Sequence, residues 1–411
     1  MRRRSLYGWA VVVLLAGCGA DSATSLEMGD RAAGPGGDAS SSGGAGAPAE
    51  PPPEREVESD YEAPVATGNY VWIANPRSGR VAFVDAVTLQ VRTVEVGNGP
   101  TYLASVPGQA QDTTVVLNVL SEDATLLRAT PEGITTKTLK TAAKANSLAF
   151  SSDGRFAIAW ADARKAQDPP RTEGFQDLTV LDLVAGTSTI LAVGYRPVAV
   201  GFSAGAPRAH AVTQDGVAIV DLSGPPKVVK NVPISDAPNE DPGTRDVFVT
   251  KDGQFAFVRR DGQATITAVS LDTGTRTPIV LGGAVTDLDL TDTGERAVAV
   301  VRDTSQAVVL PVPQIVQDPA GFTAVTVAGE TIGSVSLSPG GTRGLLYTNA
   351  VQAERVTILD LVSAQFRTVR LYSPVLGVFS SPDAAHAVGL HEKTAGPNGT
   401  PGAFSLLPVA E

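Results

Sequence analysis

One short strand pattern recurs along this chain at intervals of about 40 to 50 residues, and it constrains the fold more than any other feature of the sequence. The pattern is an apolar run that closes on Asp, and it is found at residues 81–85, 179–183, 218–222 and 357–361. Residues 268–271 form a fifth copy in which the Asp is replaced. No helical pattern lies inside the repeats. Repeats of this length that hold only strands are typical of a β-propeller, because each repeat is a small sheet that cannot bury its faces alone.

Each repeat divides into four antiparallel strands. The first strand ends in a turn rich in Asp and Gly, such as 151–154 or 250–253, because a tight hairpin needs positive φ and local side-chain caps. The second strand follows at once, the third is the strand that closes on Asp, and a more polar strand such as 365–371 comes last. The sequence therefore predicts an all-β domain whose blades have four antiparallel strands.

The number of blades follows from the inner strands, which are the first strands of the repeats. Eight can be placed, near residues 63, 101, 146, 197, 245, 285, 333 and 375. Seven blades is the alternative, because the strand at 62–66 is short. The last blade shows three strands, the third at 403–407, and an unpaired edge would be exposed there. We expect residues 54–58 to return and complete that blade.

The first blade resembles a known repeat. Residues 70–75 read Tyr-Val-Trp-Ile-Ala-Asn, the strand 81–85 follows, and residues 96–100 read Val-Gly-Asn-Gly-Pro. This order resembles the YVTN-type propeller repeat, and residues 193–197 repeat its connector. The Ser-Pro-Asp-Gly-like turns also resemble the repeats of Tol-associated propellers. The resemblance covers nearly all of 62–411, with the second and sixth blades matching less well, and it implies a fold but no activity, because such repeats describe the scaffold.

The N-terminus has the pattern of a secretion signal. Residues 2–4 are three arginines, and the apolar run 6–16 is too short to span a bilayer as a helix. Residues 15–18 read Leu-Ala-Gly-Cys and resemble the lipobox of bacterial lipoproteins, a resemblance that implies lipidation of Cys18, the only cysteine of the chain. An ordinary signal peptide with a chance cysteine is the alternative. Gly19 resembles the lipoproteins that leave the inner membrane, so we expect a lipid anchor in the outer membrane, facing the periplasm or the cell surface.

Three segments follow from these patterns. Residues 1–17 form the signal peptide, 18–60 hold the lipidated cysteine and a disordered Gly-, Ser- and Pro-rich tether, and 61–411 form the propeller domain. Without residues 1–17 the chain keeps 29 basic and 43 acidic side chains, a formal charge of −14. Such an acidic protein has no general attraction for nucleic acid, so we expect no nucleic-acid partner.

Side chains that carry chemistry are few. Histidine occurs at His210, His386 and His391, and no cysteine follows Cys18, so a His/Cys metal cluster or a Cys/His nucleophile pair is not available. A Ser/His/Asp triad stays open, although the Gly-x-Ser-x-Gly elbow is absent. Four acidic residues lie in 162–177 without the spacing of a calcium loop. We therefore predict no metal, no cofactor and no catalytic residue.

Propellers bind at the face reached by two sets of loops: those joining the second strand to the third, and those joining one blade to the next. Arginines gather in these loops, and guanidinium groups suit carboxylates or phosphates. The candidate binding residues are Asn75, Arg77, Asp162, Arg164, Arg196, Arg245, Arg259, Arg260, Arg302, Asp303 and Asn349. The competing interpretation is that short polar loops contain arginines paired to neighbouring aspartates. Three of the loops, 161–177, 234–245 and 391–402, are long, as recognition loops often are.

Three functions fit these observations. The sequence favours a lipoprotein of the cell envelope whose propeller is a non-enzymatic scaffold that binds a protein or an envelope polymer. The first alternative is a periplasmic propeller enzyme, lactonase-like or dehydrogenase-like, which would need clustered acidic residues at the channel mouth, such as Asp162, Asp246 and Asp303. The second alternative is a structural component of an envelope assembly. The lining of the central channel separates them, because carboxylates favour the enzyme, arginines the binding scaffold and an apolar plug the structural role.

Overall fold

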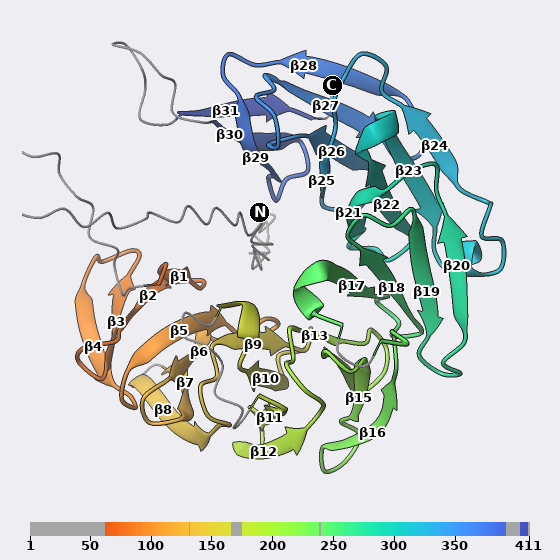
Figure 1. Cartoon of the computed structure of the whole chain (residues 1–411). Coiled ribbons are helices and arrows are strands. Elements are labelled where there is room, and N and C mark those ends of the chain that lie inside the picture. Colours follow the sequence, from red (N-terminus) through yellow and green to blue (C-terminus); the bar gives the residue numbers. More distant parts are fainter. Residues whose placement is uncertain (1–61, 131, 166–174, 238–239, 392–402, 410–411) are drawn as a thin grey trace, which may run out of the picture. The chain divides into compact units, whose positions relative to one another are not determined.

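The computed structural model describes residues 62–130, 132–165, 175–237, 240–391 and 403–409. Within them the chain forms eight antiparallel sheets, seven with four strands and one with three. Figure 1 shows the sheets following one another in chain order, with the first strand of each toward a common centre. We number these blades 1 to 8. The prediction of eight antiparallel blades is confirmed, and the described part of the last blade has the three strands that the sequence predicts.

The strands of blades 1 to 4 are β1 Val65–Ala66, β2 Tyr70–Asn75, β3 Arg80–Asp85, β4 Val91–Glu95; β5 Pro100–Ser105, β6 Thr113–Asn118, β7 Asp123–Thr130, β8 Gly133–Lys140; β9 Ser147–Phe150, β10 Phe156–Trp160, β11 Asp177–Asp182, β12 Thr187–Ala192; β13 Ala199–Phe202, β14 Arg208–Val212, β15 Val217–Asp221 and β16 Lys227–Val232. Those of blades 5 to 8 are β17 Arg245–Val249, β18 Phe255–Arg260, β19 Thr265–Ser270, β20 Arg276–Val280; β21 Val285–Leu290, β22 Arg296–Val301, β23 Gln306–Pro311, β24 Thr323–Thr326; β25 Ser334–Leu337, β26 Arg343–Tyr347, β27 Arg355–Asp360, β28 Phe366–Arg370; β29 Val375–Ser380, β30 His386–His391 and β31 Ala403–Pro408.

The described helices are single 3-10 turns: η1 Ala163–Lys165, η2 Pro242–Thr244, η3 Arg302–Thr304 and η4 Gln314–Val316. None of them is long and apolar enough to cross a membrane.

The hydrophobic core lies between neighbouring blades. A middle strand such as β10 is buried along its whole length, because each of its faces is covered by another blade. Seven apolar clusters each join two consecutive blades, from Trp72 and Leu127 between blades 1 and 2 to Val356 and Val378 between blades 7 and 8. An outer strand such as β4 is polar and largely exposed. The stacking of blades is therefore the main source of stability.

The Asp that closes the repeated strand caps the turn between the third and fourth strands. The Oδ1 atom of Asp85 accepts the backbone N–H groups of Val87 and Thr88 at 2.9 and 2.8 Å. Asp182 and Asp360 make the same two hydrogen bonds. These bonds lower the pKa of Asp85, because they favour its charged form. The residue that reveals the repeat is thus a turn cap, which any third-to-fourth-strand hairpin of this kind can use.

Several expectations concern residues outside the described ranges. These are the signal segment 1–17, Cys18 and the tether, the returning strand at 54–58, and most of the loops 161–177 and 391–402.

Candidate functional site

The antiparallel order of the strands brings two kinds of connection to one end of every blade. They are the turns between second and third strands and the connections from one blade to the next. We call this end the loop face. The candidate residues taken from the sequence lie there, either at the ends of second strands or in the blade connections. What they do is decided by their contacts.

At blade 3, two of the candidate residues form an ion pair directly after β10. The Nη2 atom of Arg164 lies 3.0 Å from Oδ2 of Asp162, and Nε donates to Oδ1 at 3.2 Å. Asp162 is almost fully buried, so the arginine compensates a carboxylate that water does not reach. Nη2 of Arg164 also donates to the carbonyl oxygen of Val198, just ahead of the inner strand of blade 4. Arg164 therefore connects two blades.

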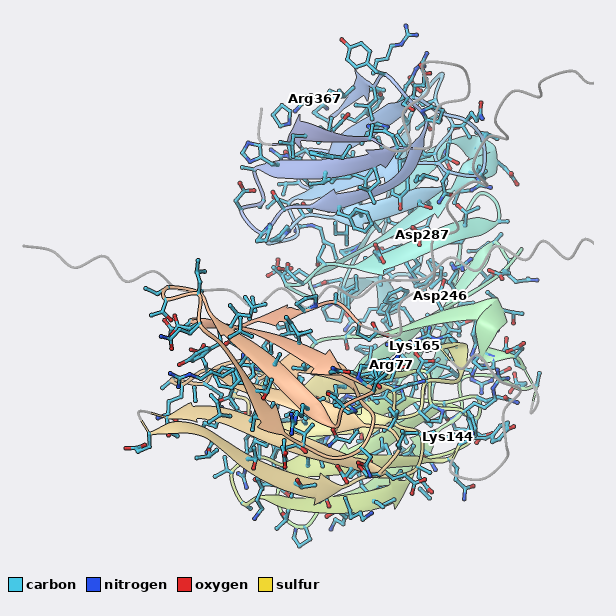
Figure 2. The ribbon with its side chains drawn as sticks, turned by 90° about the vertical axis from the view of Figure 1, so that its left-hand side faces the viewer. Arg77, Lys144, Lys165, Asp246, Asp287 and Arg367 are labelled. Atoms are coloured by element: carbon cyan, nitrogen blue, oxygen red, sulfur yellow. The ribbon has the colours of Figure 1, made fainter. Side chains whose placement is uncertain are left out.

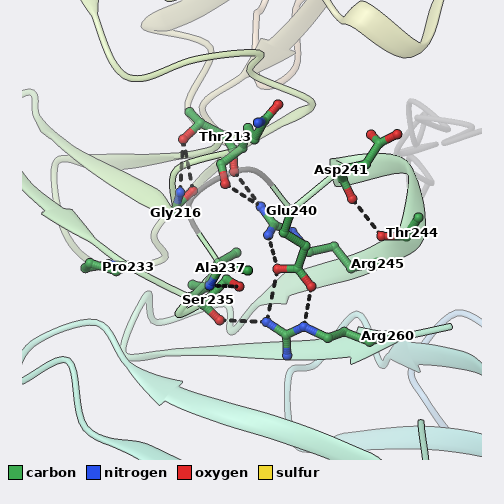
Figure 3. A network of polar contacts seen from close by, with 12 residues as sticks. Thr213, Gly216, Pro233, Ser235, Ala237, Glu240, Asp241, Thr244, Arg245 and Arg260 are labelled. Atoms are coloured by element: carbon green, nitrogen blue, oxygen red, sulfur yellow. Dashed lines mark hydrogen bonds and ion pairs between the residues drawn. The ribbon is translucent and has the colours of Figure 1, made fainter. Parts of the chain in front are cut away.

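A larger ion-pair network lies between blades 4 and 5 (Figure 3). Glu240, in the connection from β16 to β17, accepts from both Arg245 and Arg260. The side chain of Arg245 is only 1% exposed, and its Nη2 donates to the carbonyl oxygens of Thr213 and Gln214 at 3.0 and 2.8 Å. Burial alone would raise the pKa of Glu240, but hydrogen bonds from Arg260, Ser235 and Arg245 outweigh it and lower the pKa to about 2. Glu240 therefore stays ionised and holds the connection in place.

Two further arginines of the loop face are paired in the same way. Nη1 of Arg196 lies 3.4 Å from Oδ1 of Asp241, next to the network of Glu240. Nε of Arg259 donates to Oδ2 of Asp246 at 2.8 Å. Its Nη1 donates to Oδ1 of Asp261 at 2.9 Å and to the carbonyl oxygen of Val285, in blade 6, at 3.1 Å. Both arginines thus carry a carboxylate partner.

The remaining candidate residues are spread around the loop face. Oδ1 of Asn75 accepts the N–H of Arg77 at 3.1 Å, and the Arg77 side chain is exposed. Nδ2 of Asn349 donates to the carbonyl oxygen of Leu376 in blade 8 at 3.1 Å. Arg302 and the exposed Asp303 begin η3.

Gly333 provides the space for Arg302. A Cβ atom on Gly333 would stand 2.3 Å from Nη2 of Arg302, so the guanidinium lies directly against the start of blade 7. Only a residue without a side chain leaves room for it there.

These contacts agree with the competing interpretation of the arginine pattern. Arg164, Arg196, Arg245, Arg259 and Arg260 each form an ion pair with a described carboxylate. Four of them also donate to a backbone carbonyl of a neighbouring blade or of the connection that joins it. The structure brings Arg196, Arg245 and Arg260 into one neighbourhood and leaves the others apart. Their main physical effect is to hold consecutive blades together at the loop face.

Three carboxylates lie on the inner strands of blades 5 and 6. The sequence pattern singles out Asp246 on β17 but not Asp287 and Asp289 on β21 (Figure 2 labels Asp246 and Asp287). Because Leu288 and Leu290 pack in the core shared with blade 5, the alternating Asp287 and Asp289 face blade 7. Oδ2 of Asp287 accepts the N–H of Val335 in that blade at 2.8 Å. The sequence contains a signal for this pair, because Asp287 and Asp289 are two positions apart on a predicted inner strand and so lie on one face of it.

These carboxylates differ in their electrostatics. Burial raises the pKa of Asp287 above its ordinary value. Burial, together with the charges of Asp287 and Asp246, raises the pKa of Asp289 to about 7. Among the residues that the structure describes, no three His, Cys, Asp or Glu side chains are grouped closely enough to hold a metal ion.

The histidines lie in three different settings. His210 is buried on β14, where burial and the charge of Arg208 lower its pKa to about 4. Nδ1 of His391 lies 3.0 Å from the carbonyl oxygen of Ser373. The exposed His386 lies beside Asp383 in the turn that precedes β30.

The chain is a β-propeller protein by its eight radially ordered sheets and by the core between them. No protein-family model matches it, and no curated protein matches it. Similar solved structures include the β-propeller domain of Cps50 (Swd1) from Myceliophteria thermophila, with 13% identity, a TM-score of 0.41, and coverage of 81% of this chain and 96% of that one. Apo AztD from Citrobacter koseri has 11% identity and a TM-score of 0.43 over 75% of this chain and 84% of that one. Kuenenia stuttgartiensis hydrazine synthase has 19% identity and a TM-score of 0.40 over 74% of this chain and 92% of that one.

Proposed function

We propose that this chain is a lipoprotein of the cell envelope, anchored through Cys18 in the outer membrane, whose propeller serves as a non-enzymatic binding scaffold. Its partner is a protein or an envelope polymer, and it binds at the loop face. The observation that carries the proposal is the way the long connection to β17 is held: Glu240 is clamped by Arg245 and Arg260. Side chains that are already held by ion pairs lose little entropy when a partner binds, which favours recognition.

The test is capture of envelope material by the full-length protein in detergent. One variant reverses two exposed charges of the loop face that stand outside the Glu240 network, Arg77→Glu with Lys165→Glu. The matched control reverses two exposed charges near the opposite end of the blades, Arg92→Glu with Lys227→Glu. We expect the wild type and the control to capture the same partner, and the loop-face variant to lose it. Equal capture by all three proteins, or none by any, contradicts the proposal.

A second candidate function is favoured by the carboxylates of the inner strands. A propeller enzyme, lactonase-like or dehydrogenase-like, would use acidic residues near the centre of the ring, and Asp246, Asp287 and Asp289 lie on inner strands. A carboxyl group whose pKa is near 7, as for Asp289, can give or take a proton at neutral pH. Turnover of a lactone or alcohol that disappears in Asp289→Asn, with folding intact, would place this function ahead of the scaffold.

A further inference from the structure

We propose that a polar pocket between blades 4 and 5 is a binding site for a neutral saccharide. The inference rests on the proposed function and narrows it, because it identifies the envelope polymer as a glycan. The pocket has a volume of about 380 Å³, which is in the range of sites for small ligands. Its lining residues are Glu240, Thr244, Arg260, Asp261, Gln263, Thr265 and Thr267.

The pocket exists because one face of β19 carries threonines at its start and apolar residues toward its end. Thr265, Thr267, Val269 and Leu271 alternate with core residues, so their side chains point to the same side, toward blade 4. Val269 and Leu271 are buried in the apolar cluster that joins the two blades. Thr265 and Thr267 are only half-buried and line the pocket at the loop face. The apolar seam between the blades therefore ends in a polar cavity.

Comparison with the other blades shows that Thr267 is unusual. The third strands of blades 2, 3 and 7 carry a threonine at the same register: Thr125, Thr179 and Thr357. All three are buried and hydrogen-bonded within the protein. Thr179, for example, accepts the N–H of Ala142 at 2.7 Å.

The residue opposite Thr267 on the fourth strand distinguishes it from Thr125 and Thr357. Thr357 shares a hydrogen bond with Thr368 on the fourth strand, and Thr125 contacts Thr138 in the same way. Thr267 is paired with Pro278 on the neighbouring strand β20, and proline has no hydroxyl and no backbone N–H to donate. Within the described part of the chain, the hydroxyl of Thr267 makes no hydrogen bond. It is therefore available to a ligand.

The charges of the pocket select against an anion. The guanidinium of Arg260 is occupied by Glu240 and by the carbonyl oxygen of Ile234, to which Nη2 donates at 2.8 Å. Asp261 is paired with Arg259, which lies outside the lining. The pocket thus offers carboxylate oxygens as acceptors but no unpaired cation among the described lining residues.

The groups that are left match a sugar. Threonine hydroxyls and the Gln263 amide can each donate and accept, and the carboxylates of Asp261 and Glu240 accept. A saccharide hydroxyl also donates and accepts, and a neutral sugar brings no charge that these carboxylates would repel. The negative charge of a phosphate or a uronic acid would be repelled by the carboxylates and would have no unpaired cation among the described lining residues to compensate it.

The test is titration calorimetry and saturation-transfer NMR on the full-length protein in detergent. The probes are two neutral tetrasaccharides, chitotetraose and cellotetraose, and one acidic tetrasaccharide, tetragalacturonate. We expect at least one neutral probe to bind and the acidic one not to bind. Thr265→Val with Thr267→Val should weaken binding about tenfold or more, because two hydroxyl partners are lost while shape and strand propensity are kept.

Thr277→Val on β20 is the matched control, since Thr277 is half-buried in the same blade but outside the pocket lining. It should bind like the wild type. The proposal is overturned if no neutral probe binds, if the acidic probe binds equally well, or if the double variant binds like the control while all the proteins melt at the same temperature.

Sedimentation with insoluble peptidoglycan sacculi distinguishes the source of the sugar. Co-sedimentation that the double variant loses identifies a polymer, whereas binding of soluble probes alone identifies a free saccharide, and both results support the site. If the double variant still captures the envelope partner while the Arg77/Lys165 variant does not, the saccharide inference fails and the proposed scaffold stands. If neither variant loses the partner, both the saccharide site and the proposed scaffold function are contradicted.

Discussion

At the scale of single residues, the neighbours of several carboxyl groups shift their pKa values in opposite directions. Asp85 and Glu240 are held ionised by hydrogen bonds, whereas Asp289 is pushed toward its neutral form. The difference arises because Asp85 and Glu240 have donors directed at them, whereas burial and the charges of neighbouring carboxylates disfavour the ionised form of Asp289. From residue type alone, the three carboxyl groups would be expected to have similar pKa values.

The raised pKa of Asp289 predicts how stability depends on pH. The folded pKa is about 7 and the ordinary value is 3.8, so between these values the folded state holds a proton that the unfolded state has lost. Stability therefore falls as the pH rises from about 4 to about 7. Asp289→Asn removes the charge, and at pH 8 it should raise the free energy of unfolding by roughly 2 to 4 kcal/mol relative to the wild type.

Urea titrations at pH 4 and pH 8 check this prediction. At pH 4 the variant and the wild type should have nearly equal free energies of unfolding, since Asp289 is then neutral in the folded protein. Ser78→Ala, at an exposed position of the loop face that carries no titrating group, serves as the control, and its difference from the wild type should be the same at both pH values. A gap between Asp289→Asn and the wild type that is the same at both pH values would contradict the assignment.

At the scale of elements, Glu240 makes the most buried ion pair of the connection between β16 and β17 that the structure describes. Glu240 is contacted by Arg245, whose side chain is 1% exposed, and by Arg260. Removing one partner of a buried ion pair leaves the other charge without compensation, and such losses are large. We expect Glu240→Ala to lower the free energy of unfolding by about 3 kcal/mol.

The control for this element is an ion pair on the outer strands of blade 1. Arg80 and Glu95 lie 3.1 Å apart, but their side chains are 53% and 81% exposed. Water solvates each partner, so Glu95→Ala should cost less than about 1 kcal/mol. Equal losses for the two variants in urea titrations would mean that Glu240 does not act as the clamp of the connection.

At the scale of the whole molecule, the described residues form a succession of similar blades joined by apolar cores. Seven clusters link blades 1 to 8 in succession, and arginines and Asn349 tie several boundaries at the loop face. These contacts hold neighbouring blades together and so position the described loops of one face.

The lipid anchor is a prediction for the intact chain. In cells fed labelled palmitate, we expect the wild type to carry the label and to sediment with the membranes. Cys18→Ser should lose both the label and the membrane fraction, because serine has no thiol to carry the lipid. The control is His391→Gln, which leaves the N-terminal pattern unchanged and should be labelled like the wild type. Membrane sedimentation of the Cys18→Ser protein would show that another feature holds it there.

The repeat in the sequence determined the architecture, and it did so for a local reason. Each blade reuses the same turn cap and the same alternation of apolar residues, so copies such as 179–183 and 357–361 could be aligned without knowing what they pack against. Eight inner strands were placed in this way, and all eight are present. Local hydrogen bonding and side-chain period are properties that a short stretch of sequence carries with it.

The candidate site was decided only by the tertiary structure, because its contacts join residues from different blades. The sequence located arginines in the loops, but it could not tell a free guanidinium from one clamped by Glu240 or directed at the carbonyl oxygen of Val285. Nor could it show that Thr267 stands opposite Pro278 beside a pocket, while Thr357 has Thr368 as its partner. Composition and period specify which strands form, whereas the free energy of a charge or a hydroxyl depends on the neighbours that folding brings to it.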